Sequence, residues 1–92
     1  MKPSEPSADP NELVVYGAKD CSLCDKAMEV LRKLTPELGL KLRYVSIDGD
    51  AALESAYRQQ IPVGFLGGRK LFKFHVDPER LRRAAARAPR RR

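Results

Sequence analysis

Residues 14–28, VVYGAKDCSLCDKAM, contain both cysteines of the chain and lie where a strand passes into a helix. The apolar run LVVY at residues 13–16 ends at Gly17 and is typical of a strand buried on both faces. From Ser22 to Thr35, apolar residues recur at helical spacing with charged residues opposite them, and Pro36 is expected to end this helix. The cysteine pair is therefore predicted at the start of the first helix.

The next segment predicts a second strand and a short second helix. KLRYVSID at residues 41–48 is rich in β-branched and aromatic residues, as strands are. Asp48 or Asp50 is then expected to cap a helix that runs to about Gln59.

A hairpin and a third helix complete the chain. IPVGFL at 61–66 and KLFKF at 70–74 flank two glycines, which supply the positive φ angles of a tight turn. Asp77 and Pro78 then form a strong start signal, because the carboxylate caps the helix and proline suits its first position. Pro89 is expected to stop this helix.

The order β-α-β-α-β-β-α predicts an α/β domain with a four-stranded mixed sheet flanked by helices. A right-handed crossover makes the first two strands parallel, and the hairpin completes the sheet. Ninety-two residues suffice for one domain with a modest core. We expect a flexible leader over residues 1–11, the domain over residues 12–88 and a basic tail over residues 89–92.

Composition favours a soluble cytoplasmic monomer with no membrane partner. No secretory signal is visible, and no apolar stretch reaches the ~18 residues that span a bilayer. The formal net charge of +6 comes from seven C-terminal arginines opposed there by one glutamate: Arg80, Arg82, Arg83, Arg87, Arg90, Arg91 and Arg92, with Glu79. No aromatic residue is interleaved among them to stack bases, so a solvated helix face is preferred over nucleic acid binding.

The position of the cysteines predicts two different thiols. At a helix N-terminus, unpaired amides and the helix dipole favour a thiolate at Cys21, which makes it the attacking sulfur. Cys24 lies on the inward stripe, so it is expected to be more buried, less ionised and the resolving sulfur. Lys19 would stabilise the anion, whereas Asp20 and Asp25 would oppose it.

Two other interpretations of the cysteine pair stay open. A closed zinc site needs four ligands, and besides the two cysteines the chain offers only the distant His75, so no metal is expected within one chain. A metal shared across a dimer is less favoured still. Alternatively, the pair is two partly buried thiols without chemistry. We expect His75 to face solvent and the three tyrosines, Tyr16, Tyr44 and Tyr57, to pack.

Together VVYGAKDCSLC, the Ile-Pro-Val of residues 61–63 and the capped last helix resemble the glutaredoxin branch of the thioredoxin superfamily. The resemblance spans about residues 12–88 and is closest to small glutaredoxin-like bacterial proteins. It implies a thioredoxin-like fold and a thiol-disulfide oxidoreductase, with Cys21 as nucleophile and Cys24 as resolving thiol. It also implies that Pro62 is cis beside the sulfur and that the backbone of Ile61 binds the thiol substrate.

The resemblance further implies glutathione as a co-substrate, with no tightly bound cofactor, and Lys19 and Asp77 as contacts to the thiolate or to glutathione. The chain departs from glutaredoxins between the cysteines, where it has Ser-Leu and they commonly have Pro-Tyr. It also departs before the last helix, where Phe74 and His75 stand in place of Gly-Gly.

Two functions follow as hypotheses. The first is an oxidoreductase that acts on protein or low-molecular-weight disulfides. The second is a non-catalytic thioredoxin-fold module whose basic C-terminal helix contacts nucleic acid or an acidic protein. Removing residues 87–92 would separate them, because only the module would lose a salt-sensitive complex.

Overall fold

The computed structural model describes residues 9–87 and has the predicted order of elements. In chain order these are β1 (Glu12–Gly17), α1 (Ser22–Leu38), β2 (Lys41–Ser46), α2 (Ala51–Tyr57), β3 (Val63–Leu66), β4 (Arg69–Lys73) and α3 (Pro78–Arg87). The predicted basic tail and the helix stop at Pro89 lie outside the described residues, as does most of the predicted leader. Among the described residues, no helix is long and apolar enough to cross a membrane.

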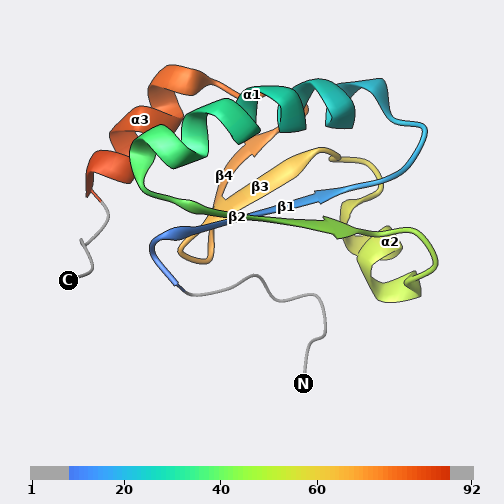
Figure 1. The fold of residues 1–92 in the computed structure, drawn as a ribbon. Coiled ribbons are helices and arrows are strands. Elements are labelled where there is room, and N and C mark those ends of the chain that lie inside the picture. The colour runs from blue at the N-terminus through green and yellow to red at the C-terminus, as the bar shows by residue number, and fades with distance from the viewer. Residues whose placement is uncertain (1–8, 88–92) are drawn as a thin grey trace.

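The four strands form one mixed sheet in the order β2-β1-β3-β4 (Figure 1). Strand β1 is parallel to β2 and antiparallel to β3, and β3 is antiparallel to β4. Gly67 and Gly68 form the two-residue turn of the β3–β4 hairpin with φ angles of 62° and 84°. Two successive positive φ angles are what this kind of turn requires, so the predicted hairpin is confirmed.

Strand β1 divides the core into two layers. Leu13 and Val15 belong to the cluster that includes residues of α1 and α3, whereas Val14 and Tyr16 belong to the cluster beneath α2. Figure 1 shows the same arrangement, with α1 and α3 on one face of the sheet and α2 on the other. A strand covered on both faces has to be apolar throughout, which explains the uninterrupted LVVY run.

Helix α1 does not stop at Pro36, and this part of the prediction is wrong. Pro36 lies in the last turn of the helix, which continues to Leu38. Gly39 follows as the left-handed cap with φ 69°, and its N–H donates to the carbonyl of Pro36 at 3.3 Å. A proline near the end of a helix removes one backbone hydrogen bond, whereas the left-handed glycine redirects the chain.

The boundaries of β2 and β3 also differ from the prediction by two residues each, and the structure selects one of the two cap candidates of α2. Strand β2 ends at Ser46, so residues 47–48 are not part of it. Asp50, and not Asp48, caps α2, because its carboxylate accepts the N–H of Leu53 at 3.1 Å. Strand β3 begins at Val63 because Pro62 has no N–H to give to the sheet.

Candidate active site

Cys21 is the N-cap residue of α1. Its backbone is extended, with φ −125° and ψ 103°, and its side chain turns back over the first turn of the helix. Its Sγ accepts the backbone N–H of Cys24 at 3.2 Å. The sulfur thus satisfies a backbone N–H that the first turn of the helix leaves without an intrahelical partner. The thiol is partly exposed, so a substrate disulfide can reach it.

Cys24 has the opposite surroundings. Its side chain is 1% exposed, and both cysteines are free thiols. Burial, followed by the side-chain hydrogen bond to Cys21, raises the pKa of the Cys24 thiol to about 11. Cys24 therefore keeps its proton at neutral pH. Cys24 is thus more buried than Cys21, as the spacing predicts.

A groove of about 700 Å³ runs along the outer side of Cys24. It is bordered by α1, by the segment that precedes it and by the end of β2. Lys19, Tyr44 and Asp48 line it together with Cys24. The predicted contact residue Lys19 is thus brought to the groove of the cysteine pair, and its backbone N–H donates to Asp48 Oδ2 at 2.9 Å.

Tyr44 is a site residue that the sequence analysis missed. It was expected to pack, yet its side chain is 41% exposed and lies across Gly17 beside Cys24. A Cβ atom on Gly17 would lie 2.6 Å from Tyr44 Oη and 3.1 Å from Cys24 Sγ, so only glycine permits this approach. In the sequence, the only signal for this contact is Gly17 itself, because a glycine in a strand often marks a close approach of another group to the backbone. Burial, followed by the nearby Cys24, raises the pKa of Tyr44.

The other two tyrosines do pack as expected. The rings of Tyr16 and Tyr57 stack with centroids 4.5 Å apart, and both meet Phe65 edge-on. They belong to the core beneath α2, away from the groove.

Asp48 is one of three acidic residues that line the groove, together with Asp25 and Glu29. It accepts hydrogen bonds from the Lys19 backbone and from the Ser46 hydroxyl, the latter at 3.0 Å. The hydrogen bond from Lys19 is the main reason why the pKa of Asp48 lies below its ordinary value. The carboxylate is therefore charged at neutral pH and ties β2 to the segment before α1.

Pro62 lies directly before β3 and is hydrogen-bonded to the segment that follows β4. The Ile61–Pro62 peptide bond is cis, and the carbonyl of Pro62 accepts the N–H of Phe74 at 2.7 Å. The side chain of Pro62 is fully buried, and that of Ile61 packs against the core beneath α2. The backbone of residues 61–62 is thereby fixed between β3 and the segment that follows β4.

Phe74 places an aromatic ring next to the cysteine segment. Its backbone is left-handed, with φ 70°, and its side chain is 37% exposed. Phe74 lines a small hollow of about 150 Å³ together with Leu23, which lies between the two cysteines, and with the exposed His75. An apolar surface therefore adjoins the cysteine pair on the side away from Tyr44.

Asp77 lies at the start of α3. Its Oδ1 accepts the N–H groups of Glu79 and Arg80 at 3.1 and 3.3 Å, and the side chain is exposed. This capping was expected, and it accounts for the residue without a ligand. Within residues 9–87, no three or more His, Cys, Asp or Glu side chains gather in a way that could hold a metal ion.

Comparison with known proteins agrees with this geometry. The model of the glutaredoxin-like domain family (DUF836) matches residues 12–85. The chain belongs to this family. The X-ray structure of protein XcR50 from X. campestris is similar to this glutaredoxin-like protein, with 41% sequence identity and a TM-score of 0.68. That match covers 84% of this chain and 99% of the other.

Two further comparisons agree with the family and with the fold. An uncharacterized protein of Mycobacterium tuberculosis is 32% identical over 73 residues, which cover 74% of this chain and 75% of its own length. The thioredoxin of Fasciola hepatica is 18% identical with a TM-score of 0.60, covering 89% of this chain and 85% of that chain. The glutaredoxin-like protein therefore has the thioredoxin fold, as its sequence predicts.

Proposed function

We propose that this glutaredoxin-like protein is a thiol-disulfide oxidoreductase in which Cys21 and Cys24 alternate between a dithiol and a disulfide. The observation that carries the proposal is the difference between the two sulfurs. Cys21 Sγ receives a helix-terminal N–H at 3.2 Å, whereas burial holds the pKa of Cys24 at about 11. A partly exposed nucleophile at a helix N-terminus and a buried resolving thiol that keeps its proton are what ordered disulfide exchange needs.

The first step is attack by the Cys21 thiolate on one sulfur of a substrate disulfide. A Cys21–substrate disulfide forms, the substrate S–S bond breaks, and the other substrate sulfur leaves as a thiolate that takes a proton. In the second step Cys24 gives up its proton and its sulfur attacks Cys21 Sγ, so that the Cys21–Cys24 disulfide forms and the Cys21–substrate bond breaks. The second substrate sulfur leaves as a thiolate that takes up a proton. The substrate gains the two electrons that the cysteine pair loses.

The resting structure suggests how Cys24 becomes reactive at the right moment. Two causes of its raised pKa, after burial, are the hydrogen bond to Cys21 and the charge of Cys21. Both depend on a Cys21 thiolate. In the mixed disulfide that negative charge is gone, so the pKa of Cys24 falls and its thiolate becomes more accessible. The order of the two steps therefore follows from the charge on Cys21, because its loss in the mixed disulfide lowers the pKa of Cys24.

We assign protein or low-molecular-weight disulfides as substrates, with the backbone of Ile61 and Pro62 as the surface that binds the substrate sulfur. Glutathione is the proposed co-substrate that restores the dithiol, with Lys19, which lines the groove, as its proposed contact. The apolar surface of Leu23 and Phe74 favours a polypeptide over glutathione as the substrate proper. A reducing compartment such as the cytoplasm suits this cycle, because it regenerates the dithiol.

The proposal is tested by trapping thiols with an alkylating agent across a glutathione redox titration and reading the products by mass spectrometry. Wild-type protein is expected to pass from two alkylated cysteines to none in a single two-electron step. Cys24→Ser is expected to accumulate a mixed disulfide on Cys21, and Cys21→Ser to lose exchange activity by at least a hundredfold. A pair that never forms the internal disulfide, or full activity in Cys21→Ser, rejects the proposal.

The substrate class is tested separately. Reduction of insulin is compared with reduction of a glutathione mixed disulfide, using the same reductant. We expect the polypeptide to be preferred. A preference for the glutathione disulfide would mean that the apolar surface of Leu23 and Phe74 does not contact the substrate. It would leave the proposed chemistry of the cysteines unchanged.

A further inference from the structure

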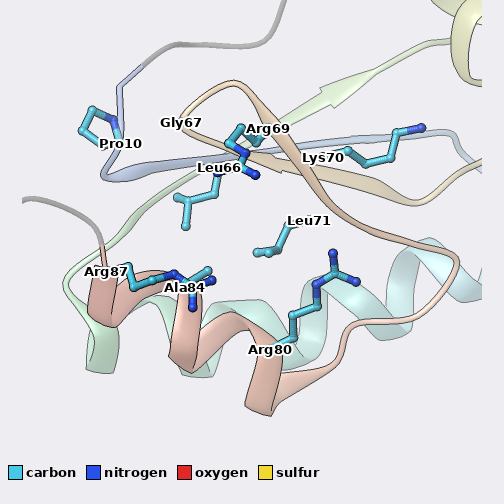
Figure 2. A pocket seen from close by; sticks show the side chains of 9 residues that line it. All are labelled: Pro10, Leu66, Gly67, Arg69, Lys70, Leu71, Arg80, Ala84 and Arg87. Carbon is cyan, nitrogen blue, oxygen red and sulfur yellow. The ribbon is translucent and has the colours of Figure 1, made fainter.

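A second pocket lies at the opposite end of the sheet from the cysteines. It has a volume of about 320 Å³ and lies between the β3–β4 hairpin and α3 (Figure 2). Leu66, which lines it, pairs with Leu13 at the start of β1, whereas the cysteine segment follows the end of β1. Figure 1 shows the hairpin turn and the last turn of α3 at the same end of the molecule. The pocket is therefore separate from the proposed redox site.

Four basic residues line this pocket, and none of its described lining residues is acidic: Arg69, Lys70, Arg80 and Arg87. Within residues 9–87, the three arginines form no ion pair. Lys70 Nζ binds Gln60 Oε1, which is neutral. The charge of Lys70 is thereby directed away from α3, whereas Arg69, Arg80 and Arg87 are left without an opposite charge among the described residues. By contrast, Arg82 on the same helix pairs with Glu79 at 3.3 Å. Like charges that line one hollow repel one another, and a bound anion would relieve that repulsion.

Helix α3 places two of these basic residues, Arg80 and Arg87, on either side of Ala84. Arg80, Ala84 and Arg87 follow one another at spacings of four and three residues, so they share one helical face. The small side chain of Ala84 leaves room between the two arginines. Leu81, which is 1% exposed, anchors the helix to the core, so the face that carries the arginines is fixed in orientation.

The floor of the pocket is apolar. Leu66 and Leu71 of the hairpin and Ala84 of α3 line it beneath the charged groups. Figure 2 shows the two leucines between the hairpin and the helix, with the guanidinium of Arg80 extending from α3 toward β4. A ligand that fits has to be anionic at one end and apolar at the other.

We infer that this pocket binds a small phosphate monoester, with its phosphate on the arginines and a compact apolar group against Leu66 and Leu71. Guanidinium groups match phosphate oxygens in paired hydrogen bonds. The volume is at the lower end of the range for small-molecule sites. No aromatic side chain is present among the described lining residues to stack a base, which favours a small ester over single-stranded nucleic acid.

The experiment is a titration of ¹⁵N-labelled full-length protein followed by backbone amide shifts. The probes are phenyl phosphate, inorganic phosphate, phenol and a single-stranded oligonucleotide without terminal phosphates. We expect phenyl phosphate to cause saturable shifts in residues 67–71 and in Ala84, with an affinity at least tenfold above that of phosphate or phenol. Cys21 and Cys24 should not shift, and Cys21→Ser should bind equally well, so the result does not depend on the redox proposal.

Two double variants with the same change of charge on the same helix supply the control. Arg80→Gln with Arg87→Gln should weaken phenyl phosphate binding at least tenfold, whereas Arg82→Gln with Arg83→Gln should change it less than twofold. Ala84→Leu should weaken binding by filling the pocket at unchanged charge, and circular dichroism verifies that each variant folds. Equal losses in both double variants, tighter binding of the oligonucleotide at the same residues, or no saturable shift would overturn the inference.

Discussion

Phe74 combines a left-handed backbone with a partly exposed aromatic ring. Its φ angle of 70° is one that side chains with a Cβ atom adopt at a cost of about 1–2 kcal/mol. The conformation is held by the hydrogen bond from its N–H to Pro62, and the ammonium of Lys73 lies 5.6 Å from the ring centroid. The residue therefore maintains a strained connection next to the cysteine segment, where its ring adjoins Leu23.

Truncating Phe74 in two ways separates the strain from the ring. Phe74→Gly and Phe74→Ala both remove the ring, but only glycine relieves the left-handed backbone. We expect Phe74→Gly to have a free energy of unfolding about 1 kcal/mol above that of Phe74→Ala in urea denaturation, despite the greater flexibility of unfolded glycine.

Gly39 provides the matched control for this pair of variants. It has nearly the same φ, 69°, and a Cβ there would meet nothing within 4 Å. Gly39→Ala should therefore lose about 1 kcal/mol for the backbone reason alone. If Phe74→Ala proved as stable as Phe74→Gly while Gly39→Ala showed its loss, the strain at Phe74 would be refuted.

At the scale of elements, the sequence predicts those helices, turns and caps that depend on residues only a few positions apart. Helical periodicity in 22–35, the two glycines of the hairpin and the cap at Asp77 are signals within a few residues, and each element is present in the structure. The position of Cys21 at a helix start has the same local origin. Pro36 misled because a left-handed glycine three residues later, and not the proline, redirects the chain.

Contacts between distant segments could not be predicted in this way. Tyr44 reaches Cys24 only because β2 is parallel to β1 and places Ser46 beside Gly17. The basic pocket combines residues of the hairpin and α3. Neither set of residues forms a motif along the chain, and both depend on how the elements pack.

Variants of Asp77 test whether its carboxylate only caps α3 or also contacts a ligand. Asp77→Asn keeps a good capping side chain and removes the charge, whereas Asp77→Ala removes both. Because the carboxylate accepts two N–H groups of α3, we expect Asp77→Ala to lose about 1 kcal/mol of folding stability and Asp77→Asn to lose less than half of that.

Thiol-exchange rates of the same two variants complete this test. If Asp77 acts only as a cap, Asp77→Asn keeps the wild-type rate with glutathione. A severalfold rise in the KM for glutathione in Asp77→Asn, at unchanged stability, would instead make the charge a contact of the co-substrate. Thermal unfolding and steady-state kinetics on the same samples distinguish the two results.

At the scale of the whole molecule, one thiol and three phenols have pKa values shifted in the same direction. Burial raises the pKa of Cys24 to about 11 and raises the pKa values of Tyr16, Tyr44 and Tyr57. These groups lie on both faces of the sheet, since Cys24 belongs to α1 and Tyr57 to α2. The folded state therefore holds protons in alkaline solution that the unfolded chain releases.

This difference makes the reduced protein less stable in alkaline solution. A raised folded-state pKa leaves stability intact below the unfolded-state pKa, which for Cys24 is about 9, and removes it as the pH rises through about 11. For Cys24 alone the two-unit difference corresponds to about 3 kcal/mol. We expect urea denaturation under reducing conditions to show a falling free energy of unfolding between pH 9 and pH 11.

The variant Cys24→Ala measures how much of the alkaline fall in the free energy of unfolding is due to the Cys24 thiol. Between pH 9 and pH 11, its free energy of unfolding should fall by up to about 3 kcal/mol less than that of the wild type. Some fall remains, because the tyrosines still titrate in the same direction. Tyr44→Phe, which keeps the ring over Gly17, should remove a smaller part, since Tyr44 is far more exposed than Cys24. If Cys24→Ala lost as much stability as the wild type, the thiol would not be held protonated by the fold, and the ordering of the two sulfurs would need another cause.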